Sequence, residues 1–134
     1  MKKSNPYLQY QQVKVNSSTK EDLIIMAYDG AIKFLNLSLS YFKENNIEKI
    51  NCYILKAHAI ISELMAIINF EAGADIAFNL LRLYEYMNSR LMQANIKKDH
   101  KPVIEIIGIL NELRSAWIVA REKVFLNAKM AGSG

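Results

Sequence analysis

Long stretches without a helix-breaking residue constrain this chain more than any other feature of its sequence. Only five glycines and two prolines occur among 134 residues, and both residue types interrupt long helices. Between them, apolar residues recur at steps of three and four, which places them along one side of a helix. No strand-like alternation of apolar and polar residues competes with this pattern. The sequence therefore predicts an all-α protein.

Four helical segments follow from the breaks in this pattern. The first begins at a capping box, Ser18 to Glu21, and ends at Asn45-Asn46. The second covers about residues 48 to 69, and the third runs from Asp75 to a break over 95–101. The fourth begins at Pro102, which suits the first turn of a helix. Short connections favour antiparallel neighbours, so we expect an antiparallel four-helix bundle with a short, mobile N-terminal segment or helix.

The bundle is expected to form one domain over residues 17–128. A chain of this length can bury a single core without disulfides. Residues 1–16 mix aromatic and polar side chains without a sustained period, so they are expected to form a detachable N-terminal segment. Residues 129–134 also lack a period and are predicted to be a disordered tail.

Charge and composition exclude several classes of function. The 17 basic and 13 acidic residues are interleaved, which is typical of solvated helix faces rather than of a nucleic-acid-binding surface. The single cysteine, Cys52, cannot form an intramolecular disulfide and suits a reducing compartment. No signal-peptide region and no run of about 18 apolar residues is present. We therefore expect a cytoplasmic protein that does not insert into membranes.

Catalytic and metal-binding patterns are weak. A di-iron bundle needs Glu-x-x-His pairs, but Leu55 and Lys97 stand three residues before His58 and His100. No glycine-rich phosphate loop occurs, and no serine has a histidine at a suggestive spacing. The sequence predicts no catalytic residues, no metal site, no cofactor and no enzymatic activity.

The first predicted helix has an unusually wide apolar face. Seven more apolar residues accompany a seam of six, although a bundle helix usually needs a narrower stripe. The pattern fits a fully buried helix as well as a groove that receives another apolar helix. The seam consists of Leu23, Ala27, Gly30, Phe34, Leu37 and Tyr41, and the additional residues are Ile24, Ile25, Ala31, Ile32, Leu35, Leu39 and Phe42.

Several motifs occur in the order found in a known family. They include Asn5-Pro6-Tyr7-Leu8-Gln9-Tyr10, Met26-Ala27-Tyr28-Asp29-Gly30-Ala31-Ile32 and Arg114-Ser115-Ala116-Trp117. Over about residues 5 to 120 the chain resembles the flagellar secretion chaperones of the FliS family. It departs from them at Ala27, where the family often has leucine, and at Ala72-Gly73, where it often has two glycines.

The resemblance implies an export chaperone of the bacterial cytosol. Such a protein binds the disordered C-terminal region of flagellin, prevents its premature polymerisation and keeps it competent for type III export. The flagellar export gate would be a further partner. The resemblance also implies that the N-terminal segment can lie over the groove, with Tyr7 and Tyr10 as reversible plugs.

The groove is expected to combine apolar residues with two polar anchors at its edge, Asp29 and Asn79. The expected apolar residues are Leu23, Met26, Ala27, Gly30, Ile60, Leu64, Leu80 and Tyr84. Each of these residues could instead belong to an ordinary core. Two other functions stay open: a homo-oligomeric structural bundle that pairs its surplus apolar stripes by self-association, and, last, a bundle enzyme or cofactor carrier.

Overall fold

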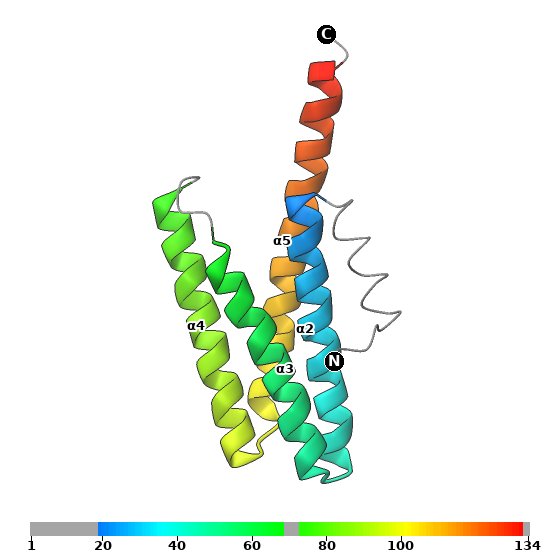
Figure 1. The fold of residues 1–134 in the computed structure, drawn as a ribbon, viewed down its shortest axis with the longest axis vertical. Helices are drawn as coiled ribbons and strands as arrows, with labels where there is room; N and C mark the ends of the chain where they lie inside the picture. Colours follow the sequence, from blue (N-terminus) through cyan, green and yellow to red (C-terminus); the bar gives the residue numbers. More distant parts are fainter. Residues whose placement is uncertain (1–18, 69–72, 133–134) are drawn as a thin grey trace, which may run out of the picture.

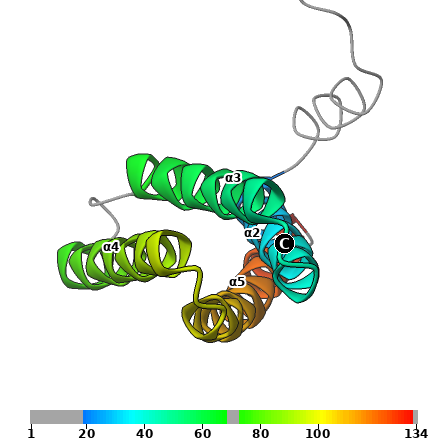
Figure 2. The same cartoon turned by 90° about the horizontal axis from the view of Figure 1, so that it is seen from below.

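Four α-helices make up the part of the chain that the computed structural model describes, residues 19–68 and 73–132. They are α2 (Lys20–Lys43), α3 (Ile47–Ala66), α4 (Ala74–Lys97) and α5 (Lys101–Gly132). Successive helices run in opposite directions (Figure 1). Each packs against two others, so that α2, α3, α4 and α5 form a ring (Figure 2). The predicted all-α antiparallel bundle is confirmed, while the N-terminal segment 1–16 lies outside the described residues.

A capping box fixes the start of α2, but one residue later than predicted. The Thr19 hydroxyl accepts a hydrogen bond from the Asp22 backbone N–H at 3.1 Å, and the Asp22 carboxylate accepts one from the Thr19 N–H at 3.4 Å. Ser18 and Glu21, the predicted pair, have the same chemistry as Thr19 and Asp22. The sequence therefore marks the helix start without fixing its register.

The connection between α4 and α5 covers residues 98–100 and is shorter than the predicted break over 95–101. Lys98 adopts a left-handed conformation with φ of 52°, and its N–H donates to the Ala94 carbonyl. Asn95, predicted to begin the break, is a buried residue within α4, and its side chain donates to the Asn51 side chain at 2.6 Å. Because its amide has a partner, Asn95 does not compete with the helix backbone. Pro102 lies in the first turn of α5, as predicted.

The last helix is longer than predicted. It contains 32 residues and ends at Gly132, so the tail expected from residue 129 is helical as far as Gly132. Lys129, Met130 and Ala131 are good helix formers. At 1.5 Å per residue, α5 is about 48 Å long, and its C-terminal end extends past the start of α2 (Figure 1).

The core lies on a different face of α2 from the predicted seam. All six seam residues are only partly buried, whereas the adjoining face carries fully buried side chains. The core contains Ile24, Tyr28, Ala31 and Leu35 of α2, Ile50, Ile54, Ala57, Ile61 and Leu64 of α3, Tyr84, Met87, Leu91 and Ala94 of α4, and Val103, Ile106 and Leu110 of α5.

The predicted seam instead forms the contact between α2 and α3. Phe34 and Tyr41 both stack on Tyr53 of α3, with ring centroids 5.9 and 5.6 Å apart. A Cβ atom on Gly30 would lie 3.3 Å from Cδ1 of Ile60, so the glycine permits a close approach of the two helices. The apolar face of α2 is wide because it contacts α3 and α5 in addition to the core.

Within the described residues, one helix, α2, is long and apolar enough to cross a membrane by length and composition alone. Four of its residues, Ile24, Tyr28, Ala31 and Leu35, belong to the core of the bundle. A core helix of a bundle passes the same test of length and composition.

Replacing Leu91 by alanine should destabilise the bundle strongly. Leu91 is fully buried at 0% exposure, and a cavity of this kind typically lowers the free energy of unfolding by about 2–5 kcal/mol. Ile96→Ala on the same helix is the matched control, because Ile96 is 78% exposed and should change stability by less than about 0.5 kcal/mol. Urea unfolding followed by circular dichroism measures both, and equal effects would contradict the assignment of the core.

Candidate functional site

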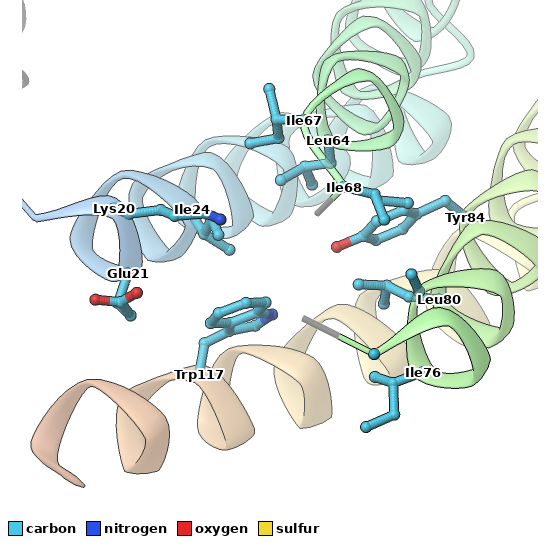
Figure 3. Close-up of a pocket in the computed structure, with 12 residues that line it drawn as sticks. Lys20, Glu21, Ile24, Leu64, Ile67, Ile68, Ile76, Leu80, Tyr84 and Trp117 are labelled. Carbon is cyan, nitrogen blue, oxygen red and sulfur yellow. The ribbon is translucent and has the colours of Figure 1, made fainter. Parts of the chain in front are cut away.

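An open pocket of about 400 Å³ lies at the end of the bundle where α2 and α4 begin and α3 ends (Figure 3). All four helices contribute to it, so the pocket depends on the arrangement of the whole bundle. It is lined by Lys20, Glu21 and Ile24 of α2, Leu64, Ile67 and Ile68 at the end of α3, Gly73, Ile76, Ala77, Leu80 and Tyr84 at and within α4, and Trp117 of α5.

The rim of this pocket carries exposed apolar side chains. Ile76 is 75% exposed and Ile67 is 52% exposed, and both line the pocket. Exposure of large apolar side chains to water around an apolar pocket is energetically unfavourable unless a ligand covers them. Lys20 and Glu21 add one charge of each sign where α2 begins. The pocket therefore suits an apolar surface with polar edges.

Three aromatic residues are hydrogen bonded beneath the pocket. The hydroxyl groups of Tyr28 on α2 and Tyr84 on α4 share a hydrogen bond, and Nε1 of Trp117 on α5 donates to the Tyr28 oxygen at 3.0 Å. Both tyrosines are fully buried, and Tyr84 and Trp117 also line the pocket. These bonds connect three helices and fix the shape of the pocket floor.

Burial changes the acidity of both tyrosines. Desolvation raises the pKa of Tyr28 above its ordinary value, although its hydrogen bonds with Tyr84 and Trp117 oppose the shift. Desolvation, together with the neighbouring Tyr28, raises the pKa of Tyr84 strongly. Both phenols therefore stay protonated over the whole physiological pH range.

Two ion pairs hold α2 against α5 on either side of Trp117. Asp29 pairs with Arg114, and Asp22 pairs with Arg121 at 3.1 Å. The pair with Arg121 lowers the pKa of the Asp22 carboxyl. Each pair is partly exposed, so its contribution to stability is small. Their spacing of seven residues on both helices matches two helical turns and fixes how α2 and α5 align.

The structure brings together only part of the predicted site. Leu64, Leu80 and Tyr84 line the pocket, whereas the other predicted residues that the structure describes do not. The partly buried ones on α2 and α3 are Leu23, Met26, Ala27, Gly30 and Ile60.

The two predicted polar anchors are both exposed. The Asp29 carboxylate is paired with Arg114 rather than placed at the pocket edge, and Asn79 lies outside the lining set. Tyr7 and Tyr10 lie outside the described residues.

Several lining residues were missing from the sequence-based site. Trp117 stood in a family-like motif, but nothing in its spacing linked it to the first helix. Ile67 and Ile68 follow the last turn of α3, and Ile76 begins α4. They meet at the pocket because the chain reverses between these helices, and the apolar periodicity within one helix carries no such information.

Metal-ligating residues do not gather within the described part of the chain: no group of three or more His, Cys, Asp or Glu side chains occurs there.

An all-α bundle with an apolar pocket open at one end is typical of proteins that hold an apolar segment of a partner. A family model described as "Flagellar protein FliS" matches residues 3–124. The flagellar secretion chaperone FliS of Bacillus subtilis strain 168 is 36% identical over 113 residues, which cover 84% of this chain and 84% of the relative. The Salmonella typhimurium protein of the same name is 34% identical, covering 81% of this chain and 84% of the relative.

The flagellar secretion chaperone FliSB of Pseudomonas aeruginosa is 33% identical, covering 81% of this chain and 90% of that protein. The chain therefore belongs to the FliS family of flagellar secretion chaperones. The resemblance drawn from the sequence motifs is confirmed.

The two buried tyrosines predict a loss of stability at alkaline pH. Their pKa values are raised in the folded protein and lie near the ordinary 10.0 in the unfolded chain. Above about pH 10 the folded state holds more protons than the unfolded state, so the free energy of unfolding falls as pH rises, and below that pH it is unaffected. Urea unfolding across this range should show a shallower fall for the double variant Tyr28→Phe, Tyr84→Phe. Equal slopes would contradict the prediction.

Proposed function

We propose that this chain is a cytoplasmic export chaperone for flagellin. Its pocket receives apolar side chains from a helix that the disordered C-terminal region of flagellin forms on binding. The bound flagellin stays unpolymerised and competent for type III export, and the complex delivers it to the flagellar export gate. Membership of a family of flagellar secretion chaperones supports this function.

The observation that carries the proposal is the exposed apolar rim of a pocket built by four helices. A volume of about 400 Å³ accommodates a few apolar side chains rather than a whole helix, so a bound helix would lie across the pocket and insert one edge. Tight binding by a segment that folds on contact requires an apolar surface well beyond the pocket itself, on the order of 2,000 Å² in total. The exposed rim residues Ile67 and Ile76 form part of that surface.

Burial of the flagellin C-terminal segment by the chaperone would block the polymerisation of flagellin. A segment that packs against other subunits in a filament presents an apolar face, and two such faces associate in water. A chaperone that buries the same face competes directly with assembly. Because the segment is disordered before binding, ordering it weakens the complex by several kcal/mol, which keeps release attainable.

The N-terminal segment is the proposed occupant of the pocket in the free protein. Lys20, the first residue of α2, lines the pocket, so the preceding chain begins at its edge. Tyr7 and Tyr10 carry an apolar ring and a polar tip, which suit reversible contact with a surface of mixed character. Flagellin would displace this segment when it binds.

Ile76→Gln should weaken binding of the flagellin C-terminal segment without affecting the fold. The side chain is 75% exposed at the pocket rim, and burying an isoleucine is worth about 1.5–3 kcal/mol, or roughly tenfold or more in affinity. Ile96→Gln on the same helix, 78% exposed and far from the pocket, is the matched control and should bind normally. Calorimetry measures both, with circular dichroism following the gain of helix.

Equal affinity of the two variants would contradict the pocket as the binding site. Light scattering on the same samples addresses self-association. A homo-oligomeric bundle would be larger than one chain without the flagellin segment, and the segment would not change its size.

Deleting residues 2–12 should increase the association rate of the flagellin segment. If the N-terminal segment covers the pocket, a fraction of molecules is closed at any time, and the apparent affinity is reduced by that fraction. Removing the segment abolishes the competition. Stopped-flow mixing of the truncated and full-length chains with the labelled flagellin segment measures the rate. Unchanged rate and affinity would argue against the plug.

A further inference from the structure

The hydroxyl of Tyr84 differs from the rest of the pocket lining because it is a polar group on an apolar floor. In Figure 3 the ring of Tyr84 lies between Ile68 and Leu80, with its oxygen on the side of Trp117. The hydroxyl of Tyr28, which the figure does not draw, is bonded to this oxygen and to Nε1 of Trp117. Tyr84 is 1% exposed, so the bulk of its ring is packed inside the protein. A buried polar group normally has a partner for each strong hydrogen-bonding hydrogen.

Counting hydrogens shows that one of them lacks a partner. Tyr28, Tyr84 and Trp117 together carry three strong donor hydrogens, two on hydroxyls and one on the indole. Two hydrogen bonds connect the three residues, and both tyrosines stay protonated because burial raises their pKa values. One hydroxyl hydrogen is therefore left without an acceptor among the described residues.

Contact with the pocket distinguishes the two hydroxyls. Tyr28 is 0% exposed and does not line the pocket, so a hydrogen left over there would have no acceptor among the described residues. If Tyr28 donates to Tyr84, it accepts from Trp117, donates once and is satisfied. The remaining hydrogen is then on Tyr84, which does line the pocket. The hydrogen bonds then run in series from Trp117 through Tyr28 to Tyr84. Such a series polarises its members, so the Tyr84 hydroxyl becomes a stronger donor.

We propose that the Tyr84 hydroxyl is a specificity-determining hydrogen-bond donor at the floor of the pocket, and that it takes an amide carbonyl oxygen of the bound segment. This inference rests on the proposed binding of the flagellin segment in this pocket. A segment that covers Tyr84 without offering an acceptor leaves the donor buried and unpaired, and is discriminated against. In the free protein, water that enters the open pocket accepts the hydrogen, and the bound carbonyl replaces it.

A neutral amide oxygen suits this position better than a carboxylate. The floor is apolar, and burying an ionised group there requires a paired charge. Lys20, the basic residue of the lining, begins α2 at the rim, whereas Tyr84 is more than two helical turns into α4. The amide oxygen has two sources: the side chain of an asparagine or glutamine, or a backbone carbonyl left free where the bound helix ends.

The test compares Tyr84→Phe with Tyr86→Phe in the full chain, using calorimetry with the flagellin C-terminal segment. Tyr84→Phe removes the pocket donor, and we expect roughly tenfold weaker binding. Tyr86→Phe is the matched control on the same helix, because its hydroxyl donates to Glu105 and it does not line the pocket, and we expect a change of less than about threefold. The double variant Tyr28→Phe, Tyr84→Phe leaves no unpaired tyrosine hydroxyl, guards against a folding defect in Tyr84→Phe, and should bind no more tightly than Tyr84→Phe. Urea unfolding confirms that each variant is folded.

Three results are decisive. Unchanged affinity of Tyr84→Phe would overturn the inference. Equal losses in Tyr84→Phe and Tyr86→Phe would also overturn it, because they indicate a general effect of removing a tyrosine hydroxyl from α4. If the wild-type chain itself does not bind the flagellin segment, the proposed function fails first, and this outcome is distinguishable from the other two.

A second arm identifies the source of the carbonyl. Each asparagine and glutamine of the segment is changed to leucine, and backbone amides are changed one at a time to esters, whose carbonyls are weaker acceptors. One of these changes should weaken binding to wild type but leave binding to Tyr84→Phe unaltered. A side-chain change with this behaviour assigns an amide side chain, and an ester change assigns the backbone. If every change weakens binding to wild type and to Tyr84→Phe by the same factor, the proposal that Tyr84 donates to a carbonyl of the segment is wrong.

Discussion

The contact between Tyr28 and Tyr84 is the interaction on which the pocket depends. The two residues lie on α2 and α4, which are not neighbours in the ring of helices. Two tyrosines meeting across the bundle keep the helices further apart than aliphatic side chains would, and their shared hydrogen bond makes this separation specific. The bond from Trp117 adds α5 to the same arrangement. Above this layer the helix ends leave the pocket, and below it Leu35, Leu91 and other aliphatic residues fill the core.

An open apolar end is a compromise between stability and function. Ile67 and Ile76 at the rim remain exposed to water, so they contribute little to the stability of the fold. A bundle that buried them would be more stable. The lower layers compensate with fully buried side chains, and the ion pairs of Asp22 and Asp29 align α2 with α5 beside Trp117. The lower part of the bundle therefore holds the four helices apart at the pocket, and the proposed partner helix would meet a pocket that is already formed.

Local sequence signals predicted the helices well and the site less well. Capping residues and Pro102 marked helix starts within a residue, because these preferences arise from nearby backbone groups. The sequence left open which apolar stripe of α2 faces the core. Its apolar residues occupy more than one stripe, so steps of three and four fit the Leu23–Tyr41 seam as well as the face of Tyr28. Of the residues predicted for the groove, Leu64, Leu80 and Tyr84 line the pocket, which lies where the chain reverses between α3 and α4.

The sequence by itself determined that the chain forms antiparallel helices, and its motifs determined the FliS family, because both depend on residue types and their order along the chain. The tertiary structure decided which apolar stripe became core, which became the α2–α3 contact and which was left open as a pocket. That choice depends on how neighbouring helices rotate and approach one another. It is set by contacts between distant residues, such as Gly30 with Ile60 and Tyr28 with Tyr84 and Trp117. Periodicity records only that a helix has an apolar side, and not what covers it.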